Sequence, residues 1–486
     1  MHRITSASRA GRGALAAVAV WLFAGAVLAA DRPNVVLFFI DTLRADRVHA
    51  YGNPRPTTPN LDALAARGTL FEQAIAQSSW SLPSYSSVFT SLYPPAHNTN
   101  ETLQMLDPAL PRVAGIFRAF GYDTAAFVGG GHLSAIFGMD VGFAKYEDKP
   151  HYGSFFHTVP KALSWLESRS EGPSPASTRP FFLMVQGYDV HLPYQAPLGF
   201  SELYDPGYRG IVHDLDILRF ENAKRISGNV YHYAARTAPG EPPVAEMDVN
   251  EDDSVPLDAR AAAAPLSARD RAHIVAHYDG ALTYADLWLG VFLAALQKRG
   301  LLEATLVVVA GDHGEALGEK GVFQHRWDLY DSQLHVPLVV AGPGVSAGRR
   351  VRSIVELVDL APTLLELAGI PRHQGHQGVS LAAFLRPGAA PPELPERTAF
   401  SALANAMSAR TARWHLVRYA DGREELYDLQ ADPTEQRNVA KEQPRVKEQL
   451  ESRLLDWYER CRREPAALAA PLSEPDREMF RRSGYW

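Results

Sequence analysis

The sequence predicts an α/β fold built on a large, mostly parallel β-sheet flanked by helices, and three observations carry this prediction. Short apolar runs recur along the chain, helical stretches lie between them, and the runs lack the alternation of polar and apolar residues that marks a half-exposed strand. Strands buried on both faces of a parallel sheet need no polar side, and alternating strands and helices form such sheets. The five runs are Val35–Ile40, Ala125–Val128, Phe181–Val185, Leu306–Ala310 and Val336–Ala341.

Three stretches between these runs have the apolar spacing of helices. They are Leu61–Arg67, Ala114–Phe120 and the longer Ala276–Lys298. The last should end before Gly300, because glycine adopts the left-handed backbone that commonly follows a helix.

The ends of four predicted strands carry the residues that suggest chemistry. Ligands of open α/β sheets bind outside the carboxyl ends of the strands, so these residues should meet at one site. They are Asp41 after the first run, His132 after the second, Asp189 and His191 after the third, and Asp312 and His313 after the fourth.

The chain divides into a main domain over 31–370 and a smaller α+β subdomain with its tail over 371–486. The second region contains a predicted β-hairpin, Trp414–Tyr419 with Glu424–Leu429, followed by a helix at Val446–Arg462. Within the main domain, 201–268 contains prolines, an acidic run and an alanine-rich patch. We expect a surface insertion there, either a lid over the site or a loop without function.

Residues 1–30 have the features of a signal peptide. Arg3, Arg9 and Arg12 precede an apolar stretch, and Ala29 or Ala30 would end the peptide. The alternative is a membrane anchor, for which the apolar stretch is short. We expect an exported protein, periplasmic or secreted, without stable membrane insertion after cleavage.

Composition narrows the function further. Hydrophobic residues make up 46% and charged residues 21% of the chain, and the net charge is −7 with no basic block, so nucleic acid is not an expected partner. The single cysteine, Cys461, allows no internal disulfide and is expected to be structural.

A candidate nucleophile stands at a predicted helix start. Ser81 lies two residues before Pro83, and proline is common in the first turn of a helix. The helix N-terminus attracts anions, so a sulfate or phosphate ester would be stabilised beside Ser81, although a simple capping serine has the same pattern.

An ordered set of motifs over about residues 33 to 440 resembles the sulfatases, which belong to the alkaline-phosphatase-like superfamily. The motifs are Asn34–Arg44, Thr57–Asp62, Ser81–Leu92 with Tyr93-Pro94 and His97, His191–Tyr194, Tyr278-Asp279 with Asp286, Gly311–Glu315, His335–Leu338, and Glu425–Leu429 with Asp432-Pro433 and Asn438.

The resemblance implies a nucleophile at Ser81, which occupies the position that sulfatases convert to formylglycine. Tyr85 stands where the family has an arginine that contributes to conversion, so two routes stay open: formylglycine, or unmodified Ser81 acting as serine does in phosphatases of the superfamily.

The resemblance also implies one divalent cation, held by Asp41, Asp312 and His313 together with the group at Ser81. The family binds Ca²⁺, but Thr42 replaces its second aspartate, and the imidazole of His313 makes Mn²⁺ or Zn²⁺ an alternative.

Three further histidines match family positions and are expected to be catalytic. His191 matches a residue that holds the sulfate and protonates the leaving oxygen, His325 lies near a family lysine, and His132 matches the histidine of a Lys-x-His motif in which Gly130 replaces the lysine. His97 and Asp286 match the family but are expected to be structural.

The resemblance therefore implies metal-dependent hydrolysis of a small-molecule or glycan sulfate ester. Two alternatives stay open: hydrolysis of a phosphomonoester, phosphodiester or phosphonate by unmodified Ser81, and an inactive exported binding protein. Retention of the nucleophile and of the metal ligands argues against the second.

Overall fold

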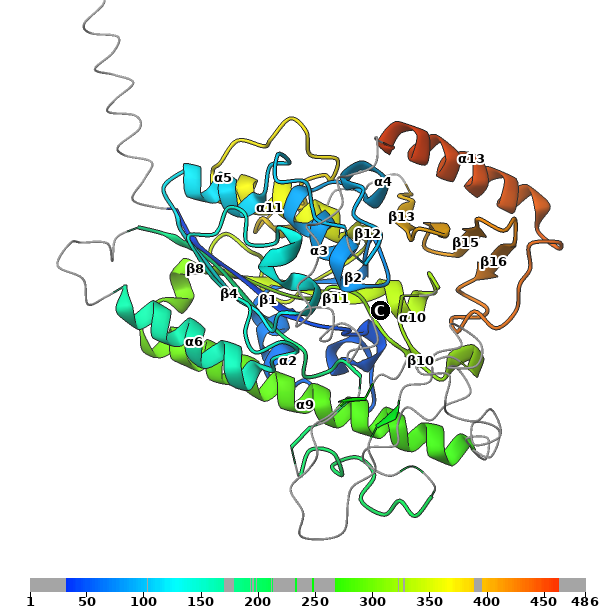
Figure 1. Cartoon of the computed structure of the whole chain (residues 1–486), viewed down its shortest axis with the longest axis horizontal. Coiled ribbons are helices and arrows are strands. Elements are labelled where there is room, and N and C mark those ends of the chain that lie inside the picture. Colours follow the sequence, from blue (N-terminus) through cyan, green and yellow to red (C-terminus); the bar gives the residue numbers. More distant parts are fainter. Residues whose placement is uncertain are drawn as a thin grey trace, which may run out of the picture.

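The computed structural model (Figure 1) describes residues 32–462 except 103, 170–178, 193, 195, 198, 211, 213–231, 234–246, 249–266, 322, 327 and 389–395. The predicted signal peptide therefore lies outside the described residues, as does most of the predicted insertion.

A mixed eight-stranded sheet forms the centre of the described chain, in the order β12-β2-β11-β8-β1-β5-β3-β4. All neighbouring pairs are parallel except those of β11, which runs antiparallel to both β8 and β2. The last apolar run is thus a buried strand, as expected, but it is not a parallel one. The strands are β1 Asn34–Ile40, β2 Thr69–Ile75, β3 Asp123–Phe127, β4 Lys145–Glu147, β5 Phe181–Gly187, β8 Thr305–Gly311, β11 His335–Ala341 and β12 Arg349–Glu356.

The central strands are apolar at nearly every position because both faces of the sheet are covered. In β1, Val35, Leu37 and Phe39 point into one hydrophobic core, and Val36, Phe38 and Ile40 point into the other. Alternate side chains of a strand lie on opposite faces, so a strand between two cores favours apolar residues on both of them.

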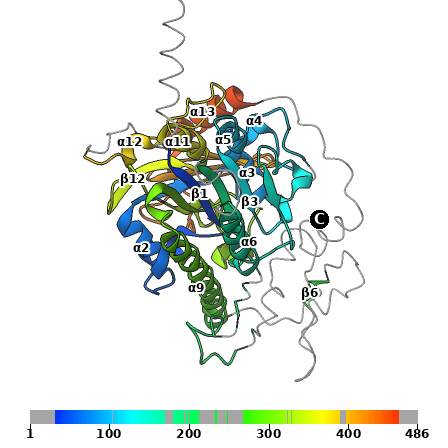
Figure 2. The same ribbon diagram turned by 90° about the vertical axis from the view of Figure 1, so that its left-hand side faces the viewer.

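Helices form a layer on each side of the sheet (Figure 2). One layer contains α3 (Ser81–Thr90), α5 (Val113–Ala119) and α11 (Leu360–Leu367). The other contains α2 (Pro59–Arg67), α6 (Phe155–Ser168) and α9 (Ala268–Lys298). This three-layer arrangement confirms the predicted fold class.

The long helix α9 begins eight residues before its predicted start, at a capping box formed by Ser267 and Asp270. It ends at Lys298, and Gly300 has the expected positive φ of 67°. By length and composition α9 could cross a membrane, but half of its most apolar window is buried against the rest of the protein. Buried Asp279 and Asp286 on this helix also suit a core helix.

A second, four-stranded antiparallel sheet follows the main domain and packs under α13 (Pro444–Cys461), as Figure 1 shows. Its strands are β13 Ala399–Ala402, β14 Ala406–Arg410, β15 Trp414–Tyr419 and β16 Glu424–Asp428. The predicted hairpin is confirmed, since Trp414 pairs with Asp428. Cys461 is buried and unpaired at the end of α13, which suits its structural interpretation.

The remaining described elements are short. The predicted insertion contributes β6 and β7, which pair antiparallel, and its role as a lid stays a prediction. These elements are α4 Pro94–His97, β6 His232–Tyr233, β7 Met247–Asp248, β9 Ala316–Leu317, β10 Phe323–Gln324, α10 Asp331–Leu334, α12 Ala382–Leu385, and the 3-10 turns Ala45–Arg47, His49–Tyr51, Gly131–Leu133, Ala135–Phe137, Leu302–Ala304, Glu319–Gly321 and Leu357–Asp359.

Candidate active site and metal centre

Strand register brings the two predicted metal-binding aspartates together. In the β1–β8 pair, Ile40 lies opposite Gly311, so Asp41 and Asp312 leave the sheet side by side at its carboxyl edge. His313 follows directly. All three side chains are fully buried, and one ligand atom from each lies within 4.8 Å of the others.

Each carboxylate uses one oxygen in the protein and leaves the other without a hydrogen-bond partner among the described residues. Asp41 Oδ2 accepts from Gln186 at 3.2 Å, and Asp312 Oδ1 accepts from the Thr42 amide at 3.2 Å, whereas Asp41 Oδ1 and Asp312 Oδ2 accept none. His313 Nδ1 donates to the Gly314 carbonyl at 2.9 Å, so its Nε2 offers a lone pair. Two carboxylate oxygens and one imidazole nitrogen fit a divalent cation.

The electrostatics of this cluster also favour a cation. Burial raises the pKa of Asp41 well above its usual range, and the neighbouring Asp312 carboxylate adds to the shift. Burial likewise raises the pKa of Asp312 to about 7. Two buried carboxylates repel one another, and a bound dication would offset both the repulsion and the lost hydration.

Thr42 does not supply a replacement ligand. Its hydroxyl donates to the Asp41 carbonyl at 2.8 Å, and its φ of 54° turns the backbone amide towards Asp312. The amide therefore holds the carboxylate of Asp312, a candidate metal ligand, in place, while the hydroxyl is hydrogen-bonded to the main chain.

Ser81 is the first residue of α3, and Trp80 is the N-cap, so the serine is not a simple capping residue. Its Oγ lies 3.2 Å from His313 Nε2 and its side chain is fully buried. The free amides of the first helical turn point towards this end. The structure thus places the predicted nucleophile beside the predicted metal ligands.

Tyr85 occupies the next turn of α3 and brings no charge to the site. It is fully buried, packs edge-on against Phe39 at 5.3 Å between ring centroids, and its hydroxyl has no hydrogen-bond partner among the described residues. Burial raises the pKa of its phenol, and Asp312 and Asp41 raise it further. A neutral phenol therefore stands where the sulfatase pattern has an arginine.

His191 and His325 lie together over the metal cluster. The His325 ring is 4.5 Å from His313 and 5.0 Å from His191, measured between centroids. Burial lowers the pKa of His191 to about 4 and that of His325 to about 3. Both are therefore neutral imidazoles near pH 7, able to hold or pass one proton.

Sequence reasoning did not single out Glu315, which supports His325 from behind. Its Oε1 lies 3.1 Å from His325 Nδ1, and it is fully buried. Burial raises the pKa of Glu315 to about 8. This carboxyl group fixes which nitrogen of His325 faces the cluster.

His132 lies near the same cluster, where its ring packs against Trp80. Its ring stands perpendicular to the Trp80 indole at 5.1 Å, and burial lowers the pKa of its imidazole well below the usual range. It supports the residue that precedes Ser81. Gly130 leaves no room for the missing lysine, since a Cβ there would lie 2.5 Å from the Asp148 carbonyl oxygen.

Sequence reasoning also missed a cation, Arg326. Its guanidinium lies 4.5 Å from the centre of the Trp80 ring and donates to the Thr102 hydroxyl. Burial lowers the pKa of both His132 and His325, and the charge of Arg326 lowers it further, so Arg326 lies within electrostatic reach of this cluster. The only available signal was its position after His325, since a φ of 90° at Arg326 cannot be inferred from the local residues.

Asp189, also at a strand end, does not join the metal cluster. Its Oδ2 accepts from the Phe155 amide at 2.8 Å, at the start of α6. His97 and Asp286 are structural, as expected: His97 Nε2 lies 3.1 Å from Ser87 Oγ, and Asp286 accepts from the Leu61 amide at 2.8 Å.

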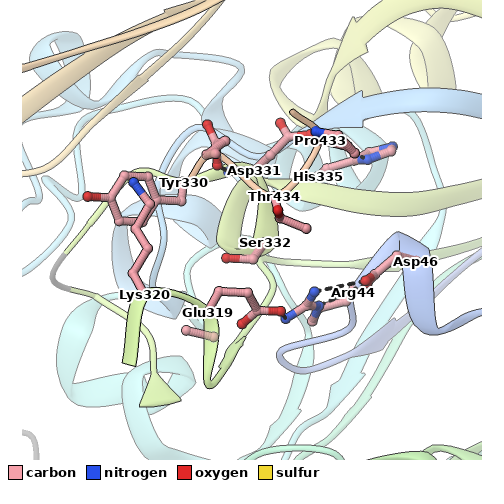
Figure 3. A pocket seen from close by; sticks show the side chains of 12 residues that line it. Arg44, Asp46, Glu319, Lys320, Tyr330, Asp331, Ser332, His335, Pro433 and Thr434 are labelled. Atoms are coloured by element: carbon pink, nitrogen blue, oxygen red, sulfur yellow. Dashed lines mark hydrogen bonds and ion pairs between the residues drawn. The ribbon is translucent and has the colours of Figure 1, made fainter. Parts of the chain in front are cut away.

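A separate cavity of about 340 Å³ is lined by residues that include Arg44, Glu319 and Lys320 (Figure 3). Arg44 points into it, paired with Asp46 and Glu319, while one of its nitrogens donates to the Glu315 carbonyl at 2.8 Å. None of the metal-site side chains lines this cavity, so it is not the catalytic pocket.

Comparison with known proteins gives matches over nearly the whole described chain. The sulfatase family model matches residues 33–370, and the model of the C-terminal region of N-sulphoglucosamine sulphohydrolase matches residues 318–460. Arylsulfatase K of Bos taurus is 27% identical over 467 residues, covering 87% of this chain and 81% of the relative. The Homo sapiens protein is 26% identical over 469 residues, covering 88% and 82%.

Solved structures share the fold. One is a protein in complex with its substrate D-glucosamine-2-N,6-O-disulfate, at a TM-score of 0.70 and 19% identity, covering 89% of this chain and 99% of the other. Another is the phosphonate monoester hydrolase of Agrobacterium radiobacter, at 0.67 and 22% identity, covering 88% and 96%.

Proposed function

This chain belongs to the sulfatase family and is a sulfuric ester hydrolase, and we propose that it cleaves carbohydrate sulfates at the buried cluster around Ser81. The observation that carries this assignment is the convergence of Ser81 with three side chains that can hold a metal, at the N-terminus of α3. A tetrahedral oxyanion ester is the substrate class that such a site stabilises.

A divalent cation held by Asp41, Asp312 and His313 would neutralise charge on the ester oxygens and favour the ionised form of the group at position 81. The imidazole among the ligands favours Mn²⁺ or Zn²⁺ over Ca²⁺, which prefers a set of oxygens only. We therefore propose a metal of this borderline type.

Residues of the chain itself would orient the ester. The first amides of α3 face one side of the sulfate group, and Arg326 supplies a fixed positive charge near His325. The burial of the cluster excludes water, which strengthens these interactions in the transition state. We propose that this pair of features offsets the loss of the arginine at Tyr85.

The group at position 81 would attack sulfur, and the leaving alcohol would need a proton. If Ser81 is oxidised to formylglycine, one of the two routes that the family resemblance leaves open, the hydrated aldehyde would supply one hydroxyl oxygen to attack sulfur. Deprotonation of its second hydroxyl would later break the bond from carbon to the sulfate oxygen, release sulfate and restore the aldehyde. We propose that His191 Nε2 would take the proton released by the attacking group and pass it to the leaving alcohol, because the Nδ1 proton of this neutral imidazole is donated to the Leu192 carbonyl at 2.6 Å. His325, backed by Glu315, stands beside it as the second group able to carry that proton.

The second candidate function is hydrolysis of a phosphoester or phosphonate by unmodified Ser81. The specific observation in its favour is the uncharged, fully buried Tyr85, which departs from the residue that accompanies formylglycine formation. A serine oxygen forms a phosphate ester that water can cleave at phosphorus, whereas a sulfated serine lacks that exit.

A carbohydrate substrate is supported by the neighbour that was solved with a disulfated glucosamine. We also propose export to the periplasm or the medium, supported by the arginines and apolar stretch of residues 1–30.

The test compares the protein with Ser81→Ala and with the control Ser86→Ala, on the same helix. Sulfate release from a sulfated glucosamine and phosphate release from a phosphoester are measured by ion chromatography. The mass of the peptide that contains residue 81 is measured by mass spectrometry. We expect Ser81→Ala to lose hydrolysis and Ser86→Ala to retain it. Sulfate release by Ser81→Ala at the unmodified rate would refute the assignment.

The mass of that peptide separates the two candidate functions. A peptide about two mass units lighter than the same peptide with unmodified serine, together with rapid sulfate release, would indicate the formylglycine route. An unmodified serine together with faster phosphate release would favour the second function instead.

A further inference from the structure

Two histidines far from the catalytic metal ligands in sequence face one another at the start of α9. His273 and His277 are one helical turn apart, and their Nε2 atoms lie 3.0 Å from each other. Residues at i and i+4 lie on the same face of a helix. Both side chains are buried, with exposed fractions of 5% for His273 and 2% for His277, so the two Nε2 atoms face one another in the protein interior.

The hydrogen bond of His273 Nδ1 determines which ring nitrogen carries the proton. Its Nδ1 lies 2.9 Å from Asp205 Oδ2. Arg269 pairs with the same carboxylate through two nitrogens, and this hydrogen bonding lowers the pKa of Asp205 to about 2. Because Asp205 is ionised and can only accept, Nδ1 carries the proton and Nε2 presents a lone pair towards His277. In the metal-free protein His277 Nε2 therefore donates the hydrogen bond between the rings, and a bound metal ion would displace this proton.

The ring of His273 is also held in this orientation from the side. Tyr208 stacks on it with 3.7 Å between ring centroids and an angle of 8°, and the Tyr208 hydroxyl donates to Asp270. A carboxylate behind an imidazole whose second nitrogen points inward is the arrangement that orients histidine ligands in metal sites.

We propose that His273 and His277 form a second metal site, separate from the active site, that binds a transition-metal dication. With metal–nitrogen distances of about 2.0–2.1 Å, nitrogens 3.0 Å apart subtend roughly a right angle at the ion. This angle suits square-planar or octahedral geometry better than tetrahedral geometry, so Ni²⁺ and Cu²⁺ should bind better than Zn²⁺.

The remaining coordination positions of the ion would be filled by water that enters when the ion binds, since both imidazoles are buried in the metal-free protein. Among the described residues, no third histidine, cysteine or acidic side chain joins this pair in a ligand cluster. The Arg269 side chain beside Asp205 is half exposed, so the pair lies close to the protein surface. The bound ion would fix the segment that carries Asp205 and Tyr208 against α9.

Ni²⁺ is the probe, and the untagged full chain with Asp312→Ala is the starting protein, because this change removes a ligand of the catalytic metal. Isothermal titration should show one Ni²⁺ per chain in this variant. Adding His277→Ala should abolish that binding, whereas adding His157→Ala, an exposed histidine on α6, should leave it unchanged. Equal Ni²⁺ binding with and without His277→Ala overturns the proposal.

A second variant covers the case in which His277→Ala does not fold. Asp205→Asn keeps both imidazoles but removes the charge behind His273, and should weaken Ni²⁺ binding about 10- to 100-fold. Absence of Ni²⁺ binding to Asp312→Ala at micromolar concentrations would show that the two nitrogens share only a hydrogen bond. Sulfate release by His277→Ala in the otherwise unchanged protein should remain normal, which separates this site from the catalytic one.

Discussion

Replacing Asp189 with asparagine should change how the stability of the protein depends on pH. Asp189 is buried, its Oδ2 accepts from the Phe155 amide, and its Oδ1 accepts no hydrogen bond from the described residues. Burial raises its pKa from 3.8 to about 7. The folded protein therefore holds a proton that the unfolded chain releases between these two values.

The sign and magnitude of this pH dependence follow from the linkage between proton binding and folding. The stabilising contribution of the protonated group is complete below pH 3.8 and is lost as the pH rises through about 7. One pKa unit corresponds to about 1.4 kcal/mol, so the full loss is about 4 kcal/mol, of which about 3 kcal/mol falls between pH 5 and pH 8. Asparagine does not titrate and can still accept from Phe155.

The assay is urea unfolding of the unmodified protein and of Asp189→Asn from pH 5 to pH 8. The new amide adds a cost of about 1–3 kcal/mol that does not depend on pH, so the slope, and not the intercept, carries the test. The unfolding free energy of Asp189→Asn should rise relative to that of the unmodified protein by about 3 kcal/mol over this range. The exposed Asp107→Asn should show no such gain. Parallel curves for Asp189→Asn and the unmodified protein would refute the reasoning.

Three further predictions concern the site and export. Asp312→Ala should lose bound metal and sulfate release together, and unchanged metal content by elemental analysis would contradict the ligand assignment. Arg326→Ala should lower kcat/KM for the sulfate ester about 10- to 100-fold, as expected for a lost charge-assisted contact; Arg326→Lys should recover part of it, and kinetics equal to those of the unmodified protein would remove Arg326 from the site. Edman sequencing of exported protein should begin at Ala30 or Asp31, and a chain that retains Met1 in a membrane fraction would contradict cleavage.

Much of the sheet could be predicted because its central strands are buried on both faces. The five apolar runs correspond to β1, β3, β5, β8 and β11. The strand β12 was not predicted, since Arg350 and Arg352 are exposed on it and dilute the apolar signal. The strand β2 was not predicted for the same reason, because it contains the polar residues Glu72 and Gln73. The antiparallel direction of β11 is a property of the connection and not of its composition.

The meeting of the three candidate metal ligands could be predicted for a related reason. Asp41, Asp312 and His313 directly follow predicted strands, and the register of a parallel pair determines that they meet. Arg326 and Glu315 could not be placed in this way. They lie in a loop whose path depends on left-handed backbone at Gln324 and Arg326, and no pattern of residues specifies that path.

The antiparallel strand β11 determines where the chain can be lengthened or shortened without changing the pairing of the sheet strands. The chain leaves β8 at Gly311 and re-enters the sheet at His335, the first residue of the neighbouring β11, so both ends of this excursion are anchored at one edge. Backbone hydrogen bonds from Gly314 to Gln333 and from Glu315 to Ser332 close the base of this excursion, so the pairing of Leu338 with Ala310 does not require a fixed number of residues between Glu315 and Ser332. This part of the chain contains His325 and Arg326, so we expect a change in its length to move these two side chains and to leave the sheet pairing as it is.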